Sequence, residues 1–540
     1  MALKTSRKMV LKKIAKLFLE NNALLTPEVT FFFSKEKNPL ELVNNGFELV
    51  KNNVISIRDL ENIDTWEKIK QKQIHTKKGN EKTFANFSPT KNTTNRIVQY
   101  SERIYGKQDL FEPELLNQDT KSIINEPILR NFEPKVEIIK DVFTPKKFRG
   151  TVDDFVEYFQ SRYKKLSKIL KIRQELAASQ KIASIRDGEK TAIIAMITDK
   201  RTTKNGHILL TVEDETGQQA VLLNRNNKRL MEDSQAILLD SVLGFVGTTK
   251  NGLFFPDEII WPDVPYKHQI NYADVPVYAA FLSDIHVGSK EFLAPVFKRF
   301  IKFLRGEGTK EWEKRLGPKV KYVFFAGDEV DGIGVYPKQE NDLLIDDINE
   351  QYDVFASFIN EFPDDVTVFV IPGNHDMVRR AEPQPKIPSS FANSLADMDN
   401  VYLVSNPSLV RTHGVKTLLY HCTPMLDMVN HLPMHTIERP ADIMREMLRI
   451  RHLSPIYGER SPIVPEKEDH LVIEELPDIF HGGHVHIHGF NKYRGILIVN
   501  SGTMQSQTEY QKQLNITPTP GKITLINLNN HLTRHLEFYK

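Results

Sequence analysis

The feature that most constrains the fold of this chain is a series of short apolar runs, each of which ends in a polar motif. The runs and motifs are VYAAFLS before Asp284-Ile285-His286, KYVFFA before Gly327-Asp328, VTVFVIP before Gly373-Asn374-His375-Asp376, and KTLLY before His421. Runs of this kind are typical of strands that are buried on both faces. Because open α/β sheets gather their ligands at the carboxyl ends of strands, we expect an α/β domain with these motifs at one edge.

The motifs supply carboxylate and imidazole groups in the pattern of a metal site. Asp284 and His286 are two residues apart, so that on an extended segment both side chains point to the same side and hold one metal together. His486, in the later motif Gly483-His484-Val485-His486, completes the ligands of this first metal. The carboxylate of Asp328 can bridge two cations and so lower their mutual repulsion.

A second metal is expected beside the first. Asn374 offers a neutral amide oxygen, and His421 and His484 complete the second set of ligands. Mixed oxygen and nitrogen ligation suits Mn, Fe, Zn or Ni, with Mg as a further candidate, and the ligand types do not decide among them. A pair of divalent metals about 3.5–4 Å apart promotes in-line displacement at phosphorus, so the motifs predict phosphoester hydrolysis.

His375 stands between Asn374 and Asp376, and we assign it to the substrate rather than to a metal. There it would stabilise charge on phosphate oxygens or protonate the leaving oxygen, with Asp376 orienting it. Other histidines lie near the motifs, and we expect supporting or structural roles for them. They are His431, His435, His452, His481 and His488. Cys422 is expected to be a packing residue, although a thiol beside His421 could bind a metal adventitiously.

The rest of the chain divides by composition and periodicity. Residues 1–70 predict a small helical domain that begins with a basic amphipathic helix, either solvated or binding DNA or a partner. Residues 71–145 are polar, rich in Lys, Asn and Thr, and predict a flexible linker. Residues 146–262 predict a helix capped by Thr151 and then a small β domain, and residues 263–540 predict the α/β domain.

The β domain is expected to be a barrel. Period-two runs at TAIIAMI, HILLTVE, QAVLLN, AILLDSV and GLFFPDEI, with Asn-Gly hairpin signals, indicate five short strands and an oligonucleotide-binding type of closed barrel. Barrels of this kind bind single strands through exposed aromatic side chains. The aromatic residues on these runs are few, Phe245, Phe254 and Phe255, so a structural or subunit-docking role is favoured over direct DNA contact.

Composition sets limits on where the chain works. Lys+Arg 72 against Asp+Glu 70 gives a net charge of +2, so that any nucleic-acid surface must be local. The single cysteine, Cys422, excludes a disulfide framework and favours a reducing, cytoplasmic location. No apolar run approaches the roughly 18 residues that span a bilayer, so no membrane association is expected.

The five motifs resemble the pattern of the calcineurin-like metallophosphoesterase superfamily, D-x-H, G-D-x-x-D, G-N-H-D, H and G-H-x-H, with Cys422 where many members have glycine. The segments FFAGDEVDGIGVYP, MREMLRIRHLSPIYG, PDIFHGGHVHIHGFNKYRG and IVNSGTMQSQTEYQ are similar to small subunits of the archaeal family D DNA polymerases. The resemblance covers roughly residues 150–540. It implies two mixed β-sheets packed face to face and flanked by helices, preceded by the oligonucleotide-binding barrel.

The resemblance also implies a function, a 3′–5′ exonuclease that proofreads for a separate large polymerase subunit in a heterodimer. It implies the same metal ligands, with His375 catalytic, and DNA with a single-stranded 3′ end or a primer–template as substrate. A contact with a sliding clamp stays open. Two alternatives remain: a non-catalytic scaffold subunit, against which the intact ligand set argues, and a stand-alone metallophosphatase or repair nuclease, against which the barrel and the PIYG and YRG segments argue.

Overall fold

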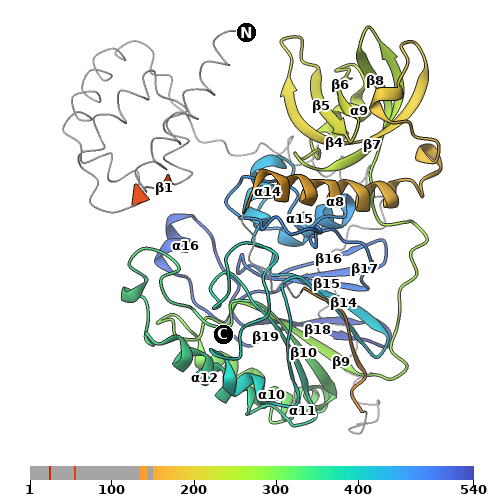
Figure 1. The fold of residues 1–540 in the computed structure, drawn as a ribbon. Helices are drawn as coiled ribbons and strands as arrows, with labels where there is room; N and C mark the ends of the chain where they lie inside the picture. The colour runs from red at the N-terminus through yellow and green to blue at the C-terminus, as the bar shows by residue number, and fades with distance from the viewer. Residues whose placement is uncertain (1–23, 26–53, 56–132, 143–149, 540) are drawn as a thin grey trace, which may run out of the picture. The chain divides into compact units, whose positions relative to one another are not determined.

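The computed structural model describes residues 24–25, 54–55, 133–142 and 150–539 (Figure 1). The chain forms two compact units, residues 1–95 and 96–540. In the first unit, the short strands β1 (Leu24–Leu25) and β2 (Val54–Ile55) pair in parallel. The predicted N-terminal helices and most of the predicted linker lie outside the described residues. Among the described residues, no helix has both the length and the apolar character needed to cross a membrane.

The first large sheet of the second unit has six strands in the order β12-β11-β10-β9-β18-β19. Their bounds are β9 Tyr278–Leu282, β10 Val320–Ala326, β11 Thr367–Ile371, β12 Val401–Leu403, β18 Lys522–Asn527 and β19 Thr533–Glu537. Strands β9 to β12 are parallel, and β18 pairs antiparallel with β9 and β19. The sheet is therefore mixed, and it contains three of the predicted strands.

The second large sheet also has six strands, in the order β16-β17-β15-β14-β13-β3. Their bounds are β3 Val136–Asp141, β13 Ser408–Thr412, β14 Val415–Leu419, β15 Ile479–Gly482, β16 Gly489–Tyr493 and β17 Ile496–Asn500. Strand β3 differs from the expectation, because it falls inside the predicted linker. It pairs antiparallel with β13, and this partner lies far along the sequence.

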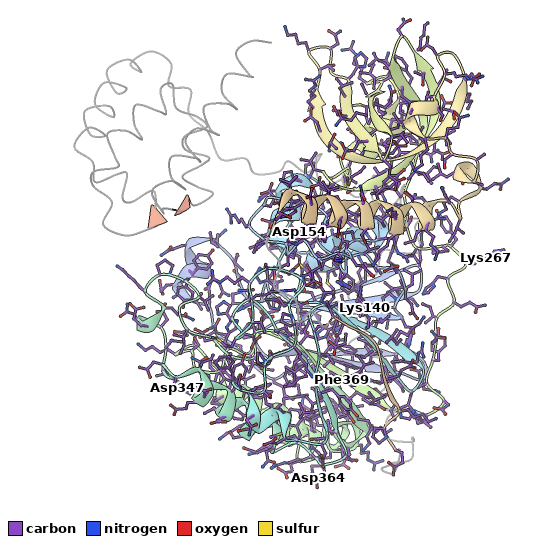
Figure 2. The ribbon with its side chains drawn as sticks, viewed as in Figure 1. Lys140, Asp154, Lys267, Asp347, Asp364 and Phe369 are labelled. Carbon is purple, nitrogen blue, oxygen red and sulfur yellow. The ribbon has the colours of Figure 1, made fainter. Side chains whose placement is uncertain are left out.

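The two sheets pack face to face, as expected. Side chains along β9 alternate between two apolar clusters, with Ala279 and Phe281 facing the second sheet and Tyr278, Ala280 and Leu282 facing the helices. Between the sheets, the stacked rings of Phe281, Phe324 and Phe369 run across neighbouring strands, and Phe369 is labelled in Figure 2. The strands are thus buried on both faces, which explains their continuous apolar runs.

Helices cover the outer face of each sheet (Figure 1). The first sheet carries α10 (Ala294–Leu304) and α12 (Ile348–Ile359). The short helices α11 (Glu311–Leu316) and α13 (Asn393–Ala396) contribute side chains to the same apolar cluster. The second sheet carries α14 (Met425–His431) and α15 (Pro440–Ile450). The two sheets are therefore flanked by helices, as the family resemblance implies.

The predicted five-stranded barrel is present and closed, in the order β4-β5-β6-β8-β7. Its strands are β4 Lys190–Thr202, β5 Ile208–Asp214, β6 Gly217–Leu223, β7 Val242–Lys250 and β8 Leu253–Ile260, with α9 (Lys228–Ser234) between β6 and β7. The run AILLDSV is not a strand as expected: Ala236, Ile237 and Leu238 are buried in the apolar cluster that includes the barrel core, and β7 begins at Val242. Phe245 and Phe254 are also buried there, so neither ring is free to stack on a base.

Helix α8 (Val152–Leu170) confirms the predicted helix, and the hydroxyl of Thr151 caps it by accepting from the backbone N–H of Asp154. The buried guanidinium of Arg162 on this helix donates from Nε to Oδ2 of Asp469 over 2.7 Å. It also donates to the carbonyl oxygen of Pro455 at 2.6 Å and to that of Asp240 at 3.2 Å. This side chain therefore ties together α8, the barrel and the α/β domain.

Candidate metal centre

The motifs meet at one place although they belong to two sheets. Asp284, Asp328 and Gly373 follow β9, β10 and β11 of the first sheet, and His421 and Gly483 follow β14 and β15 of the second. The carboxyl ends of strands from both sheets therefore form the site together. The sequence predicted strand-end placement, but it did not predict that the two sheets would share one site.

The ligands expected for the first metal come together. The ligand atoms of Asp284, His286 and His486 all lie within 4.8 Å of one another. Nε2 of His286 is 3.0 Å from Nε2 of His486, which is itself 3.4 Å from Oδ1 of Asp284. All three side chains are buried. One carboxylate and two imidazoles thus converge on one point.

The second set converges in the same way. The ligand atoms of Asp328, His421 and His484 also lie within 4.8 Å of one another. Nε2 of His421 is 3.2 Å from Oδ2 of Asp328 and 3.0 Å from Oδ1 of Asn374. The amide oxygen of Asn374 therefore faces the same imidazole nitrogen as the carboxylate.

Asp328 lies between the two sets. Its Oδ2 is 3.2 Å from Nε2 of His421 in one set and 3.9 Å from Nε2 of His286 in the other. Its Oδ1 accepts a hydrogen bond of 2.8 Å from the backbone N–H of His375. One oxygen is thus held by the protein, and the other faces both histidines, as a bridging carboxylate requires.

The backbone of the ligands is not extended, contrary to the basis of the Asp284–His286 prediction. Five of the ligand residues have left-handed backbones, with φ of 54° at Asp284, 55° at His286, 58° at Asp328, 75° at His484 and 59° at His486. Non-glycine residues in this conformation cost energy, and such residues concentrate at functional sites. The two side chains of the first motif do converge, but two left-handed residues bring them together rather than the period of a strand.

The outer ring nitrogens of three histidines have polar partners. Nδ1 of His421 is 2.7 Å from the carbonyl oxygen of Ala326, and Nδ1 of His286 is 3.0 Å from Oδ1 of Asp331. Nδ1 of His486 is 2.8 Å from the side-chain amide of Gln511. Metal-binding histidines are usually oriented in this way by a contact at the ring nitrogen that does not bind the metal. Together with the oxygen and nitrogen donors, these contacts fit a pair of divalent cations.

The site concentrates negative charge and holds it in the ionised form. Burial alone would raise the pKa of Asp328, but His421 and His375 hold it well below its usual range. Burial would lower the pKa of His421, yet the neighbouring Asp328 raises it to about 10. Burial and the nearby His421 lower the pKa of His484 to about 3. The ionised carboxylate of Asp328 thus attracts positive charge, which the His421 ring carries here.

His375 and Asp376 have different surroundings from those expected. Nδ1 of His375 is 2.7 Å from the backbone carbonyl oxygen of Asp331, so that residue orients the ring. The carboxylate of Asp376 instead accepts from the backbone N–H groups of Asp328 and Gly373, both at 2.8 Å, and from the hydroxyl of Tyr352 at 2.9 Å. Asp376 therefore fixes two motif loops against each other rather than holding His375.

Sequence reasoning placed Asp331 in the second motif, G-D-x-x-D, but gave it no ligand role, and it did not include several glutamines in the site. Asp331 shares a group of potential ligand atoms with His286 and His375. The side-chain amides of Gln339 and Gln505 donate to its carboxylate at 3.0 and 3.2 Å. Asp331 belongs to the second motif, which could have indicated it. The glutamines lie outside any metal-ligand spacing, and only the family-like segment SGTMQSQTEYQ pointed to Gln505 and Gln511.

The remaining histidines lie outside the described ligand groups, as expected. Their contacts are His431 with Glu459, His435 with Glu446, His452 with Asp469, His481 with Ser501, and His488 with Thr524. Cys422 is fully buried, and burial raises its pKa well above the usual range. Its thiol contacts the carbonyl oxygen of Tyr420 at 3.2 Å, which fits a packing role.

Two glycines permit the close approach of the motif loops. A Cβ on Gly373 would lie 2.2 Å from Oδ1 of Asp328, and one on Gly483 would lie 2.6 Å from Oδ2 of Asp284. Any larger residue at either position would push a carboxylate out of the site. These glycines are therefore required by the ligand positions themselves.

The sequence is similar to proteins of DNA replication. A family model that describes the B subunits of DNA polymerases alpha and epsilon matches residues 281–490, which include every expected ligand. The DNA polymerase II small subunit of Methanothermobacter thermautotrophicus is 44% identical over 413 residues, covering 76% of this chain and 84% of that protein. The proteins of the same name from Methanocaldococcus jannaschii and Archaeoglobus fulgidus are 41% and 39% identical. The alignment with the first spans 74% of this chain and 68% of that protein, and the alignment with the second spans 75% of this chain and 81% of that protein.

Proposed function

The chain belongs to the family of archaeal DNA polymerase II small subunits, and from that premise we propose that it is the proofreading 3′–5′ exonuclease of a two-subunit DNA polymerase. It hydrolyses the phosphodiester bond at the 3′ end of a DNA strand. Its partner is the large catalytic subunit that synthesises DNA. The proposal assigns the site to a reaction that neither the fold nor the family name specifies.

One observation carries the proposal, the position of Asp328 between the two groups of histidines. An oxygen of its carboxylate lies 3.9 Å from His286 and 3.2 Å from His421. Paired metals that act on phosphodiesters lie about 3.5–4 Å apart and so commonly share a ligand, and Asp328 is the carboxylate that both groups of histidines face. A scaffold subunit would not need a carboxylate in this buried position.

The residues of the chain have separable roles in this proposal. Asp284, His286 and His486 would hold one divalent cation, and Asn374, His421 and His484 would hold the other. Asp328, which lies between the two groups, would serve both. When bound, the two cations supply a nucleophile at neutral pH and stabilise charge on the phosphoryl oxygens. Mn²⁺ suits these oxygen and nitrogen ligands, although other divalent ions of similar preference can compete for them.

His375 acts on the substrate rather than on the metals. Because Nδ1 of its ring faces the carbonyl oxygen of Asp331, this nitrogen carries the proton when the ring is neutral. In the protonated ring Nε2 also carries a proton, and it is then the atom that donates to the phosphate oxygens or to the leaving 3′ oxygen. A positioned acid of this kind accelerates proton transfer by about 10²–10⁴-fold.

The domain division is also part of the proposal. We propose residues 146–262 as the helix and the oligonucleotide-binding barrel and residues 263–540 as the nuclease domain, whereas the expected helical domain (1–70) and most of the expected linker (71–145) lie outside the described residues. Strand β3 then belongs in structure to the nuclease domain, because it extends that domain's second sheet. The buried aromatic residues of the barrel favour subunit docking over base stacking for this domain.

The test is digestion of 5′-labelled single-stranded and mismatched primers by the full chain in Mn²⁺, alone and with the large subunit. Wild type should shorten both substrates from the 3′ end, and a matched primer–template more slowly. Asp328→Ala and His375→Ala should lose most of this activity. Robust digestion by both variants would show that the site is assigned wrongly.

Two other functions make different predictions in the same experiment. A scaffold subunit would support polymerase assembly but digest no primer. A stand-alone phosphatase would cleave small phosphoesters and leave the primers intact.

A further inference from the structure

A short loop beside His375 displays apolar side chains to solvent. The loop runs from Gly332 to Tyr336, directly after the second motif. Ile333 is 48% exposed and Tyr336 is 37% exposed, and Met377, on the other side of His375 in the sequence, is 44% exposed. Large apolar side chains that stay exposed in one place commonly mark a binding site.

The loop is held rigidly although it lies on the surface. Oε1 of the buried Gln351 accepts from the backbone N–H of Gly332 at 2.9 Å, and Oε1 of the buried Gln339 accepts from that of Val335 at 2.9 Å. Gln351 also donates from Nε2 to the carbonyl oxygen of Gly332 at 3.2 Å. Burying an amide side chain costs free energy unless it is hydrogen-bonded, and here both amides hydrogen-bond to the loop backbone and fix its shape.

The loop is also fixed against the candidate site. A Cβ on Gly332 would lie 2.2 Å from the carbonyl oxygen of His375, so the loop backbone presses on the third motif. Gln339 donates both to the carbonyl oxygen of Asp331 and, at 3.0 Å, to its carboxylate. The ring of Tyr336 lies 6.4 Å from the ring of His375, measured between centroids. The aromatic ring therefore keeps a set position relative to the group that meets the scissile phosphate.

We propose that Tyr336 is a positioning residue that stacks on the unpaired 3′-terminal base, with Ile333 and Met377 adding apolar contact. This inference rests on the proposed nuclease function and names how the same site holds its substrate. A base separated by one sugar from the scissile phosphate lies where an aromatic ring next to His375 can reach it. A base that is paired in a duplex cannot offer its face in this way, which gives preference for frayed ends without reading the sequence.

A cation stands beside the loop as well. The guanidinium of the exposed Arg380 donates to the carbonyl oxygens of Gly334 and Val335. These bonds tie its positive charge to the loop backbone at the two residues that precede Tyr336. Arginine at such a place suits the phosphate of the next nucleotide, so the loop offers both a stacking surface and a charge.

The experiment measures binding of labelled single strands that end either in a normal nucleotide or in an abasic one. Affinities are taken by fluorescence anisotropy in Ca²⁺ with the full chain, and initial rates of digestion are taken in Mn²⁺. Stacking on a base changes affinity by about 10- to 100-fold, so Tyr336→Ala should weaken binding of the normal end by that factor. It should leave the abasic end unchanged, because that substrate has no base to stack.

Two control variants sharpen the test. Tyr336→Phe keeps the ring but removes the hydrogen bond from its hydroxyl to Asp342, 3.1 Å in length, and should bind like wild type. Tyr266→Ala removes a tyrosine that is 83% exposed and stacks on Arg494, and it should change neither substrate. An equal loss on normal and abasic ends, or no loss on either, would overturn the proposal. So would weaker association with the large subunit while DNA affinity stays unchanged.

The two proposals fail in different ways. If wild type digests no strand yet binds normal ends better than abasic ends through Tyr336, the nuclease assignment fails and the stacking site stands. If wild type digests strands and Tyr336→Ala does so equally well, only the stacking site fails.

Discussion

Nε2 of His286 lies 3.0 Å from Nε2 of His486, although 200 residues separate the two histidines in the sequence. Both rings are buried, and Oδ1 of Asp284 lies within 4.0 Å of each Nε2. Two imidazole nitrogens that face each other beside a carboxylate are well placed to share a cation. The fold therefore brings together three potential ligands that are far apart in the sequence, and binding of a metal would stabilise their close approach.

Loss of this pair should abolish metal binding at the first position. We expect His486→Ala to weaken Mn²⁺ affinity by at least about 100-fold, more than the loss of an outer contact usually costs. At a metal concentration of 100 times the dissociation constant, wild type should gain about 2.7 kcal/mol of stability, which a thermal shift detects. His488→Ala is the matched control, since His488 contacts Thr524 instead. A full thermal shift in His486→Ala would contradict the assignment.

Gln511 should matter although it is not a ligand. Its amide is 2.8 Å from Nδ1 of His486, so Gln511→Ala frees the ring to turn away from the metal. Loss of such a contact typically costs about 10- to 100-fold in metal affinity or activity. Gln513, exposed on the same helix α16 (Glu509–Gln513), provides the control in Gln513→Ala. Equal effects of the two substitutions on Mn²⁺ titration would argue against the role.

Substitution of His375 should slow the reaction without weakening metal binding. His375→Ala is expected to lower the rate of primer digestion by about 10²–10⁴-fold, the range that a positioned acid contributes. Metal affinity should stay near that of wild type, since His375 contributes to neither of the two main ligand groups. Calorimetric titration with Mn²⁺ checks this directly. Loss of a metal from the variant would instead make His375 a ligand, together with His286 and Asp331.

The sequence was most informative where one motif follows one strand. Asp284, Asp328 and His421 each come directly after a run that is apolar on both faces, and local patterns of this kind can be read without a structure. Strand β3 was not predicted, because its partner β13 lies far along the chain and its own side chains are only half-buried at most. Likewise, the run at 236–239 is apolar because it packs against the apolar cluster, not because it is a strand.

The sequence predicted which motif side chains lie together, but it did not predict the contacts that support them. The ligand types and their order carry the chemistry, whereas Gln511 and the loop carbonyl of Asp331 act through contacts that no spacing rule describes. Asp376 illustrates the difference. Its place beside His375 in the sequence suggested a partnership, but its carboxylate turns inward to the backbone of Asp328 and Gly373.

The buried ion pair between Arg162 and Asp469 should be essential for stability. Both side chains are 0% exposed, so removing one charge leaves the other buried and unpaired. Asp469→Asn is expected to lower the free energy of unfolding by about 3–5 kcal/mol. Asp257→Asn, which breaks the exposed pair with Lys190, should cost no more than about 1 kcal/mol. Thermal midpoints of the two variants give the comparison, and equal midpoints would contradict it.

His452 should make the chain sensitive to acid. Its Nδ1 accepts from the backbone N–H of Ser454 at 3.1 Å and its Nε2 lies 2.8 Å from Asp469, so the ring is neutral in the folded state. Burial, with Arg162 nearby, lowers the pKa of His452 to about 4. An unfolded histidine titrates near 6.5, so between about pH 6.5 and 4 only the unfolded state gains the proton and stability falls as the pH falls.

A substitution isolates this effect from other titrating groups. His452→Gln keeps an amide that can donate to Asp469 but does not titrate. Its stability should change less than that of wild type between pH 6.5 and 4, measured by thermal unfolding at each pH. Parallel curves for the two proteins would exclude His452 as the cause.

The most direct test of the central claim is the identity of the product released from a DNA strand labelled at its 3′-terminal nucleotide. With Mn²⁺, the wild-type chain should release that nucleotide as a monophosphate before any shorter internal fragment appears. Asp328→Asn should release none, and Asp346→Asn, which alters a carboxylate outside the ligand groups, should behave like wild type. Release of internal fragments first, or full activity in Asp328→Asn, would contradict a two-metal exonuclease at this site.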